Sequence, residues 1–258
     1  MQNNYPRIYS ISTIGIKQHY NADYLFHNNR TDFSGESGSG KSMISDMIQL
    51  ILIGSADFQS STDGNKPREV KGMVLDLKGK SSSRGYMFLN IEVSRNKFIV
   101  IGAYIESTSN QAELFIIQNG YDWETLTPLE TPFFYNGLIL NNNIETLSSV
   151  SGKIENATLK SFSRKKYHQI LFDNEIIALD LVQKDILKSY ASILRSFSRG
   201  KGFKVDSFHL KNFLFGDDDQ NSIKKKYDEE VVNINNDFHE HKRYLEEIEL
   251  INSKQKFI

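Results

Sequence analysis

A short run near the N-terminus has residue types and spacing that suit the binding of a phosphate chain. It fits the pattern G-x-x-x-x-G-K-[ST] and consists of Gly35, Glu36, Ser37, Gly38, Ser39, Gly40, Lys41 and Ser42. Glycines let the backbone turn tightly, so that its N–H groups can point at phosphate oxygens without clashes from Cβ atoms. We therefore interpret residues 35–42 as a phosphate-binding loop.

The two residues that end this run have side chains that can bind phosphate and Mg²⁺. Lys41 offers a mobile positive charge to the β- and γ-phosphates of a nucleotide, and the Ser42 hydroxyl is a suitable ligand for Mg²⁺. Apolar residues at helical spacing follow as far as Gly54, so a helix should begin at the loop and add the positive end of its dipole. The sequence predicts ATP and Mg²⁺ as cofactors; a glycine- and serine-rich surface loop is the alternative.

Efficient hydrolysis needs more than this loop. A Walker-B acid at a strand end usually completes the Mg²⁺ shell, and another group positions the attacking water. The sequence contains no run of four apolar residues followed by Asp-Glu, and the nearest candidate, Asp180 after IIAL, is followed by Leu181 in a helical pattern. We expect Asp180 to be a solvated helical residue, and half of the ATPase site to come from polypeptide outside this chain.

Composition narrows the class of protein. The 258 residues carry a formal net charge of −1 and include no Cys, which excludes a disulfide framework, thiol catalysis and thiolate metal sites. Apolar residues make up 39%, enough for a sizeable core. No apolar run reaches the roughly 18 residues that a membrane span needs, and the polar start is unlike a signal peptide. We expect a cytoplasmic protein without a membrane partner.

Patterns along the chain predict the elements that position the loop. Residues 8–16 are typical of a strand, and a polar stretch separates them from the loop and its helix. Three apolar and aromatic runs, at 84–93, 97–106 and 112–118, indicate an antiparallel meander. Residues 141–216 have a mostly helical pattern.

The last segment, residues 217–258, has a different character. Tyr227 begins a heptad pattern of alternating four- and three-residue steps that runs to Asn252, surrounded by Lys and Glu. A helix that starts near Ile223 and has roughly 36 residues would be about 50 Å long, which is too long for a small compact domain. We predict the start of an antiparallel coiled coil whose returning helix is not in this sequence; an amphipathic helix folded onto the core is the alternative.

Three stretches resemble the N-terminal half-head of SMC-like ATPases, in particular the bacterial condensin (MukB) type and the related anti-plasmid (Wadjet) type. They are GESGSGKSMISDMIQLILIG, PREVKGMVLDLKG, and YHQILFDNEIIALDL followed by SYASILRSFSRG. The likeness spans most of the first 240 residues, but only the loop motif is sharp. Glu36 and Ser37 stand where Pro or Arg and Asn are frequent in the family.

The resemblance implies an α/β P-loop NTPase fold of the ABC/SMC head type. Residues 1–216 would be the N-terminal half-head, with an antiparallel β-subdomain at about 68–135 and a helical connector at about 160–216, and 217–258 would begin the coiled-coil arm. ATP would be sandwiched between two heads, each completed by a C-terminal half with the signature motif and Walker B, so that the chain would be an ATPase only when complemented. Accessory subunits are possible further partners.

The resemblance also implies roles for three side chains. Arg68 matches the family's loop arginine near the nucleotide, and Asp46 matches its helical acid. Gln169 is a candidate for the glutamine that senses the γ-phosphate and contacts Mg²⁺, with Gln118 at a strand end as the alternative.

DNA is the partner that the resemblance implies for the heads, held through phosphate contacts without base readout. Two stretches are rich in basic residues. Residues 66–84 contain Lys66, Arg68, Lys71, Lys78, Lys80 and Arg84 against Glu69 and Asp76, and residues 160–211 contain 11 basic and 5 acidic residues. Ordinary solvated surface is the alternative interpretation.

We therefore expect the ATP-binding half-head of an SMC-like ATPase that acts on DNA, in chromosome organisation or in defence against plasmids and phage. Two other classes stay open. One is a self-contained P-loop NTPase or kinase, which would need all its catalytic groups in this chain. The other is a degenerate, non-catalytic nucleotide-binding protein that interacts with partners.

Overall fold

The computed structural model describes residues 5–27, 31–61, 68–75, 83–118, 138–140, 143–150, 158–199, 227, 230–232 and 234–248. The chain divides into two compact units, Met1–Phe203 and Lys204–Ile258. The predicted boundary at residue 216 lies outside the described residues.

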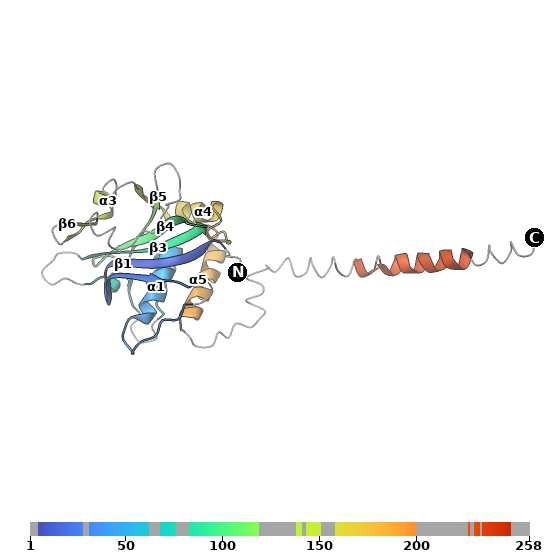
Figure 1. Cartoon of the computed structure of the whole chain (residues 1–258), viewed down its shortest axis with the longest axis horizontal. Helices are drawn as coiled ribbons and strands as arrows, with labels where there is room; N and C mark the ends of the chain where they lie inside the picture. The colour runs from blue at the N-terminus through green and yellow to red at the C-terminus, as the bar shows by residue number, and fades with distance from the viewer. Residues whose placement is uncertain are drawn as a thin grey trace, which may run out of the picture. The chain divides into compact units, whose positions relative to one another are not determined.

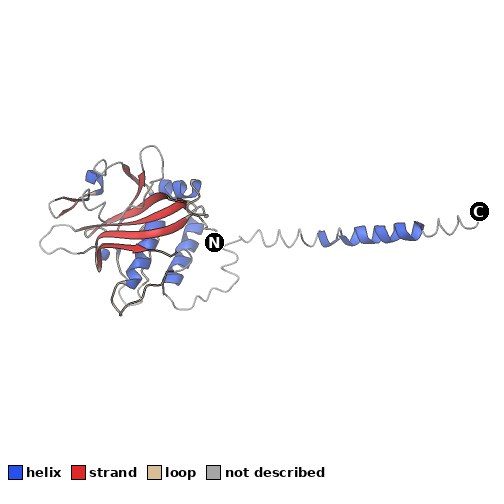
Figure 2. Ribbon diagram, in the orientation of Figure 1, coloured by secondary structure: helices blue, strands red, loops and turns tan. Residues whose placement is uncertain are grey.

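A strongly hydrogen-bonded antiparallel sheet forms the centre of the first unit (Figure 2). Its strand order is β2-β1-β3-β4-β5-β8, and every neighbouring pair is antiparallel. The strands are β1 (Arg7–Ile16), β2 (His19–Leu25), β3 (Arg84–Ser94), β4 (Lys97–Glu106), β5 (Ala112–Gln118) and β8 (Thr158–Phe162). The predicted meander is confirmed as β3, β4 and β5, and these strands continue the sheet that β1 and β2 begin.

Alternation along the strands divides the sheet's side chains between two apolar clusters, because successive side chains point to opposite faces. In β3, Met87 and Leu89 belong to one cluster, whereas Tyr86 and Phe88 belong to the other. Helices cover the first face: α1 (Lys41–Ile53), α4 (Arg164–Asp173) and α5 (Lys184–Arg199) (Figure 1). The second face packs against β6 (Ile139–Leu140), β7 (Asn143–Ile144) and α3 (Leu147–Val150).

Helix α1 is the predicted helix after the glycine-rich loop, and the structure confirms it. Its apolar residues are buried against the sheet, among them Met47, Leu50 and Ile51. It ends where predicted, because Gly54 takes a positive φ of 77° and donates its N–H to the Leu50 carbonyl oxygen at 2.9 Å. The mixed α/β character is thus established by a central antiparallel sheet and the helices packed on it.

The region predicted to be mostly helical contains more strand than its pattern indicated. β8 lies in it and forms the sheet edge beside β5, with Leu114 opposite Phe162. The helical pattern around Asp180 is also interrupted, because Glu175, two residues after the end of α4, adopts a left-handed φ of 57°. Asp180 lies in the turn before α5, where its carboxylate accepts the Val182 N–H at 3.1 Å, so the helical assignment of this residue was wrong.

In the second unit, the described residues between 227 and 248 are helical, as the heptad pattern predicts. Their apolar side chains are exposed within the chain, and Phe238 is 66% accessible. Arg243 and Glu247 form an ion pair one turn apart on the same helix. Pairing into a coiled coil stays a prediction. Among the described residues, no helix combines the length and apolar character needed to cross a bilayer.

His168 joins α4 to the C-terminal end of α1. It is 2% exposed, and its Nε2 lies 3.0 Å from the Leu52 carbonyl oxygen. A carbonyl oxygen only accepts, so Nε2 carries the proton in this contact. Burial lowers the pKa of His168, because the charged imidazolium is poorly solvated there.

The free energy of unfolding should therefore fall as the pH drops below about 6.5, the ordinary pKa of an unfolded histidine. The folded state disfavours the proton that the unfolded chain takes up, so the contribution of His168 is present above that pH and lost as the pH falls through the lowered pKa. Urea titrations at pH 7.5 and 5.5 would measure this. His168→Gln should show a smaller difference between the two pH values; an unchanged difference would exclude His168 as its source.

Candidate functional site

The glycine-rich loop leads into the N-terminal end of α1. Gly40 immediately precedes the helix with a left-handed φ of 92°, and its carbonyl oxygen accepts the Met43 N–H at 2.8 Å. Gly38 also has a positive φ, 87°. A Cβ at Gly40 would lie only 2.5 Å from His19 Nε2, so both conformation and space require glycine there. The preceding strand β2 ends at Leu25, and the described residues 31–40 before the helix form no strand.

The Lys41 side chain folds back over the loop. Its Nζ donates to the carbonyl oxygens of Gly35 at 2.6 Å and Glu36 at 2.7 Å, and all three groups are exposed. The ammonium is thus held beside the helix N-terminus, which has neither an acidic residue in its first turn nor a side-chain cap. The Lys41 ammonium and the N-terminal end of the α1 dipole both contribute positive potential at this point on the surface, and together they favour the binding of an anion.

Two residues of the turn between β1 and β2 support the loop. Gln18 Nε2 donates to the Gly38 carbonyl oxygen at 2.7 Å, and His19 Nε2 lies 3.1 Å from the Gly40 carbonyl oxygen. Since that oxygen only accepts, His19 carries its proton on Nε2, and Nδ1 accepts the Tyr24 hydroxyl at 2.6 Å when the ring is neutral. The hairpin therefore fixes two carbonyl groups of the loop.

Sequence reasoning missed this support. Gln18, His19 and Tyr24 lie in the stretch that was interpreted only as polar, and they precede the loop by many residues. No spacing rule links a strand turn to a loop of this kind. Only the antiparallel return of β2 on β1 brings the turn to the loop.

Asp46 is the centre of a buried polar cluster on the side of α1. Its side chain is 1% exposed and accepts bonds from Ser60 Oγ at 3.0 Å, the Ser61 N–H at 2.7 Å and Arg68 at 2.6 Å. Ser61 also donates its hydroxyl to the Ser42 carbonyl oxygen at 2.9 Å. This cluster ties the segment after α1 to the first half of the helix, and it is where Arg68 is placed.

The structure separates Gln169 from Ser42. Gln169 lies on α4 and donates to Asp173 at 2.7 Å. The same helix contacts the far end of α1, because Tyr167 donates its hydroxyl to the Ile51 carbonyl oxygen. Ile51 is roughly 14 Å along the helix axis from Ser42. Gln169 thus lies on a helix that contacts the end of α1 opposite to Ser42, and its role at a metal ion stays a prediction.

The other two candidates for catalytic or sensing roles lie on other elements of the fold. Gln118 ends β5 opposite Thr158 of β8. Asp180 holds the turn before α5 and accepts the Gln183 side chain at 3.1 Å. Among the described residues there is no group of three His, Cys, Asp or Glu arranged to hold a metal ion.

Several basic residues proposed for DNA contact are engaged in ion pairs. Lys71 pairs with Glu69 at 2.9 Å, Arg84 with Glu106 at 3.4 Å, and Arg164 with Asp57 at 2.8 Å. These contacts are partly exposed and contribute little to stability. Lys66, Lys78 and Lys80 lie outside the described residues. Contact with DNA stays a prediction.

A scan against protein-family models gave no match, and neither did a search of curated proteins.

The buried Asp46 cluster can be tested by comparing two aspartates that both pair with arginine. Asp46→Ala should lower the free energy of unfolding by about 3 kcal/mol, because it removes a buried charge and leaves Arg68, which is 19% exposed, without that carboxylate. Asp57→Ala removes the more exposed partner of Arg164 and should cost at most about 1 kcal/mol. Chemical denaturation measures both, and equal losses would contradict the role assigned to Asp46.

Proposed function

We propose that residues 35–42 bind the triphosphate chain of ATP together with Mg²⁺. The observation that supports this most is Lys41, whose ammonium is held over the loop carbonyls beside an uncapped helix N-terminus. Phosphate oxygens would replace those carbonyls as the partners of Nζ, and the backbone N–H groups of the loop and of the first turn of α1 would donate to them. The Ser42 hydroxyl, in that turn, would be a ligand of the metal ion.

We further propose that this chain is the ATP-binding half-head of an SMC-like ATPase acting on DNA. The glycine-rich loop, the helix after it and the exposed heptad stripe at 227–248 fit that layout. Hydrolysis would require the acid and the signature motif of a C-terminal half-head, and ATP would lie between two such heads. The γ-phosphate would then favour the closed pair of heads through contacts that it makes with both.

The loop assignment can be tested with the isolated chain and radiolabelled ATP in a filter-binding assay. Wild-type protein should retain ATP weakly with little turnover. Lys41→Ala should abolish retention, because the charge beside the β- and γ-phosphates is lost. Lys165→Ala, which removes an exposed lysine on α4, is the matched control and should bind like wild type. Equal retention by the Lys41 variant would refute the assignment.

His19 should contribute to ATP affinity without touching the nucleotide. His19→Ala removes the N–H that holds the Gly40 carbonyl group, and one neutral hydrogen bond of about 1 kcal/mol corresponds to roughly fivefold weaker binding. Tyr24→Phe leaves the ring in place and should have a smaller effect in the same direction. Fluorescent-nucleotide titrations, with circular dichroism to check folding, measure this; unchanged affinity in both variants would exclude the support role.

A further inference from the structure

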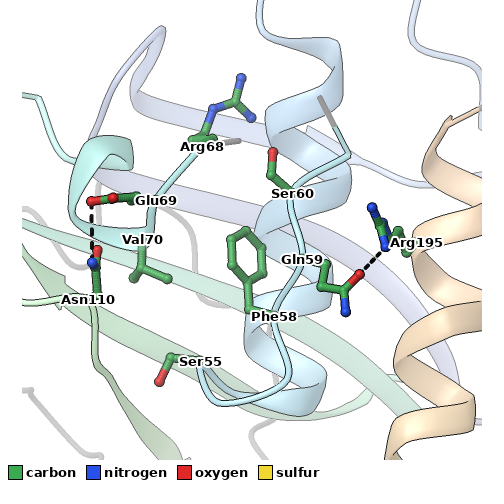
Figure 3. Close-up of a pocket in the computed structure, with 9 residues that line it drawn as sticks. All are labelled: Ser55, Phe58, Gln59, Ser60, Arg68, Glu69, Val70, Asn110 and Arg195. Atoms are coloured by element: carbon green, nitrogen blue, oxygen red, sulfur yellow. Dashed lines mark hydrogen bonds between the residues drawn. The ribbon is translucent and has the colours of Figure 1, made fainter. Parts of the chain in front are cut away.

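A second pocket lies beside α1, lined by the segment that follows this helix (Figure 3). Its volume is about 420 Å³, within the range of small-molecule sites. The lining residues include Phe58, Gln59, Arg68, Glu69, Asn110 and Arg195. They come from the segment after α1, the residues around the short 3-10 turn Val70–Met73, the β4–β5 turn and α5.

The pocket has chemically different sides. Figure 3 shows the Phe58 ring in the middle, with Arg195 on one side and the Glu69–Asn110 pair on the other, while Arg68 lies above. Guanidinium groups recognise carboxylate and phosphate oxygens, and aromatic faces stack on flat rings. The Glu69 carboxylate can accept hydrogen bonds from the edge of a heterocycle, and the Asn110 amide can donate hydrogen bonds to it.

The polar walls of the pocket are held in place by contacts within the fold. Asn110 Nδ2 donates to Glu69 Oε2 at 3.3 Å, and Asn110 Oδ1 accepts the Lys71 N–H at 3.2 Å. Gln59 contacts Arg195 through its side chain, and its N–H donates to Gln49 of α1 at 3.2 Å. Groups positioned in advance lower the entropy cost of binding a ligand.

We propose that this pocket binds a small molecule that joins a flat heterocyclic ring to one acidic group, of the nucleoside monophosphate class. The phosphate would lie toward Arg195, because Arg68 already pairs with the buried Asp46 carboxylate at 2.6 Å. The ring would lie on Phe58, with its polar edge toward Asn110 and toward Glu69, which also pairs with Lys71 at 2.9 Å. This site is separate from the loop at residues 35–42, which suits a longer phosphate chain. The proposal does not depend on the function proposed for that loop.

The test uses the whole chain and the four common ribonucleoside monophosphates, AMP, GMP, CMP and UMP, as probes in ligand-observed NMR titrations up to about 1 mM. At least one probe should bind wild-type protein. Arg195→Gln and Asn110→Ala should each weaken that binding, the arginine change by about tenfold because a charge-assisted bond is lost. Asn110 is exposed, so its substitution tests the pocket with little effect on the free energy of unfolding.

Two matched variants separate this site from the glycine-rich loop. Lys41→Ala should leave monophosphate binding unchanged, whatever it does to ATP. Arg84→Gln removes an arginine paired with Glu106 outside the pocket and should also bind normally. The proposal is overturned if no probe binds, if binding is lost in Lys41→Ala, or if it persists unchanged in both pocket variants.

Discussion

The burial of one face of α1 against the sheet is the constraint on which the rest of the first unit depends. Met47, Leu50 and Ile51 are fully covered, and burying each apolar side chain of this size contributes about 1.5–3 kcal/mol. This packing leaves the helix N-terminus at the surface, where the glycine-rich loop meets solvent. The other end is closed by Gly54 and by the α4 side chains that bind its last carbonyl groups. The helix thus has one end at the surface and one end closed by packing against α4.

Polar contacts determine how the neighbouring segments sit on this helix. Asp46 gathers Ser60, Ser61 and Arg68 at one carboxylate, and a buried charge of this kind is tolerated only when its hydrogen bonds are made. The same segment forms walls of the second pocket. The loop carbonyls, in turn, are held by the β1–β2 turn. Both candidate sites therefore lie beside α1, but the β1–β2 turn holds the glycine-rich loop, whereas the segment after α1 forms the pocket.

The described part of the fold brings together only some of the groups that nucleotide hydrolysis would need. The motif supplies a cation, a hydroxyl and backbone donors, which are the groups that we propose bind phosphates. Asp180, which was considered as the acid that completes the Mg²⁺ shell, holds the turn before α5. Gln169, which was considered as the residue that senses the γ-phosphate, bonds Asp173 on α4. This distribution of residues is consistent with a chain that binds nucleotide and needs a further polypeptide segment for hydrolysis. The exposed apolar side chains of the second unit, such as Phe238, are consistent with a helix that pairs outside itself.

The sequence alone determined what depends on neighbours in the chain: the loop motif, the helix that ends at Gly54, the three meander strands and the helical heptads. These follow from local backbone preferences and from the period of apolar residues. The tertiary structure alone decided that His19 meets Gly40, that Arg68 meets Asp46 and that β8 completes the sheet edge. It also placed Gln169 on a helix that contacts the C-terminal end of α1. Such contacts join distant residues, and their geometry depends on how strands pair and helices pack, which no local pattern specifies.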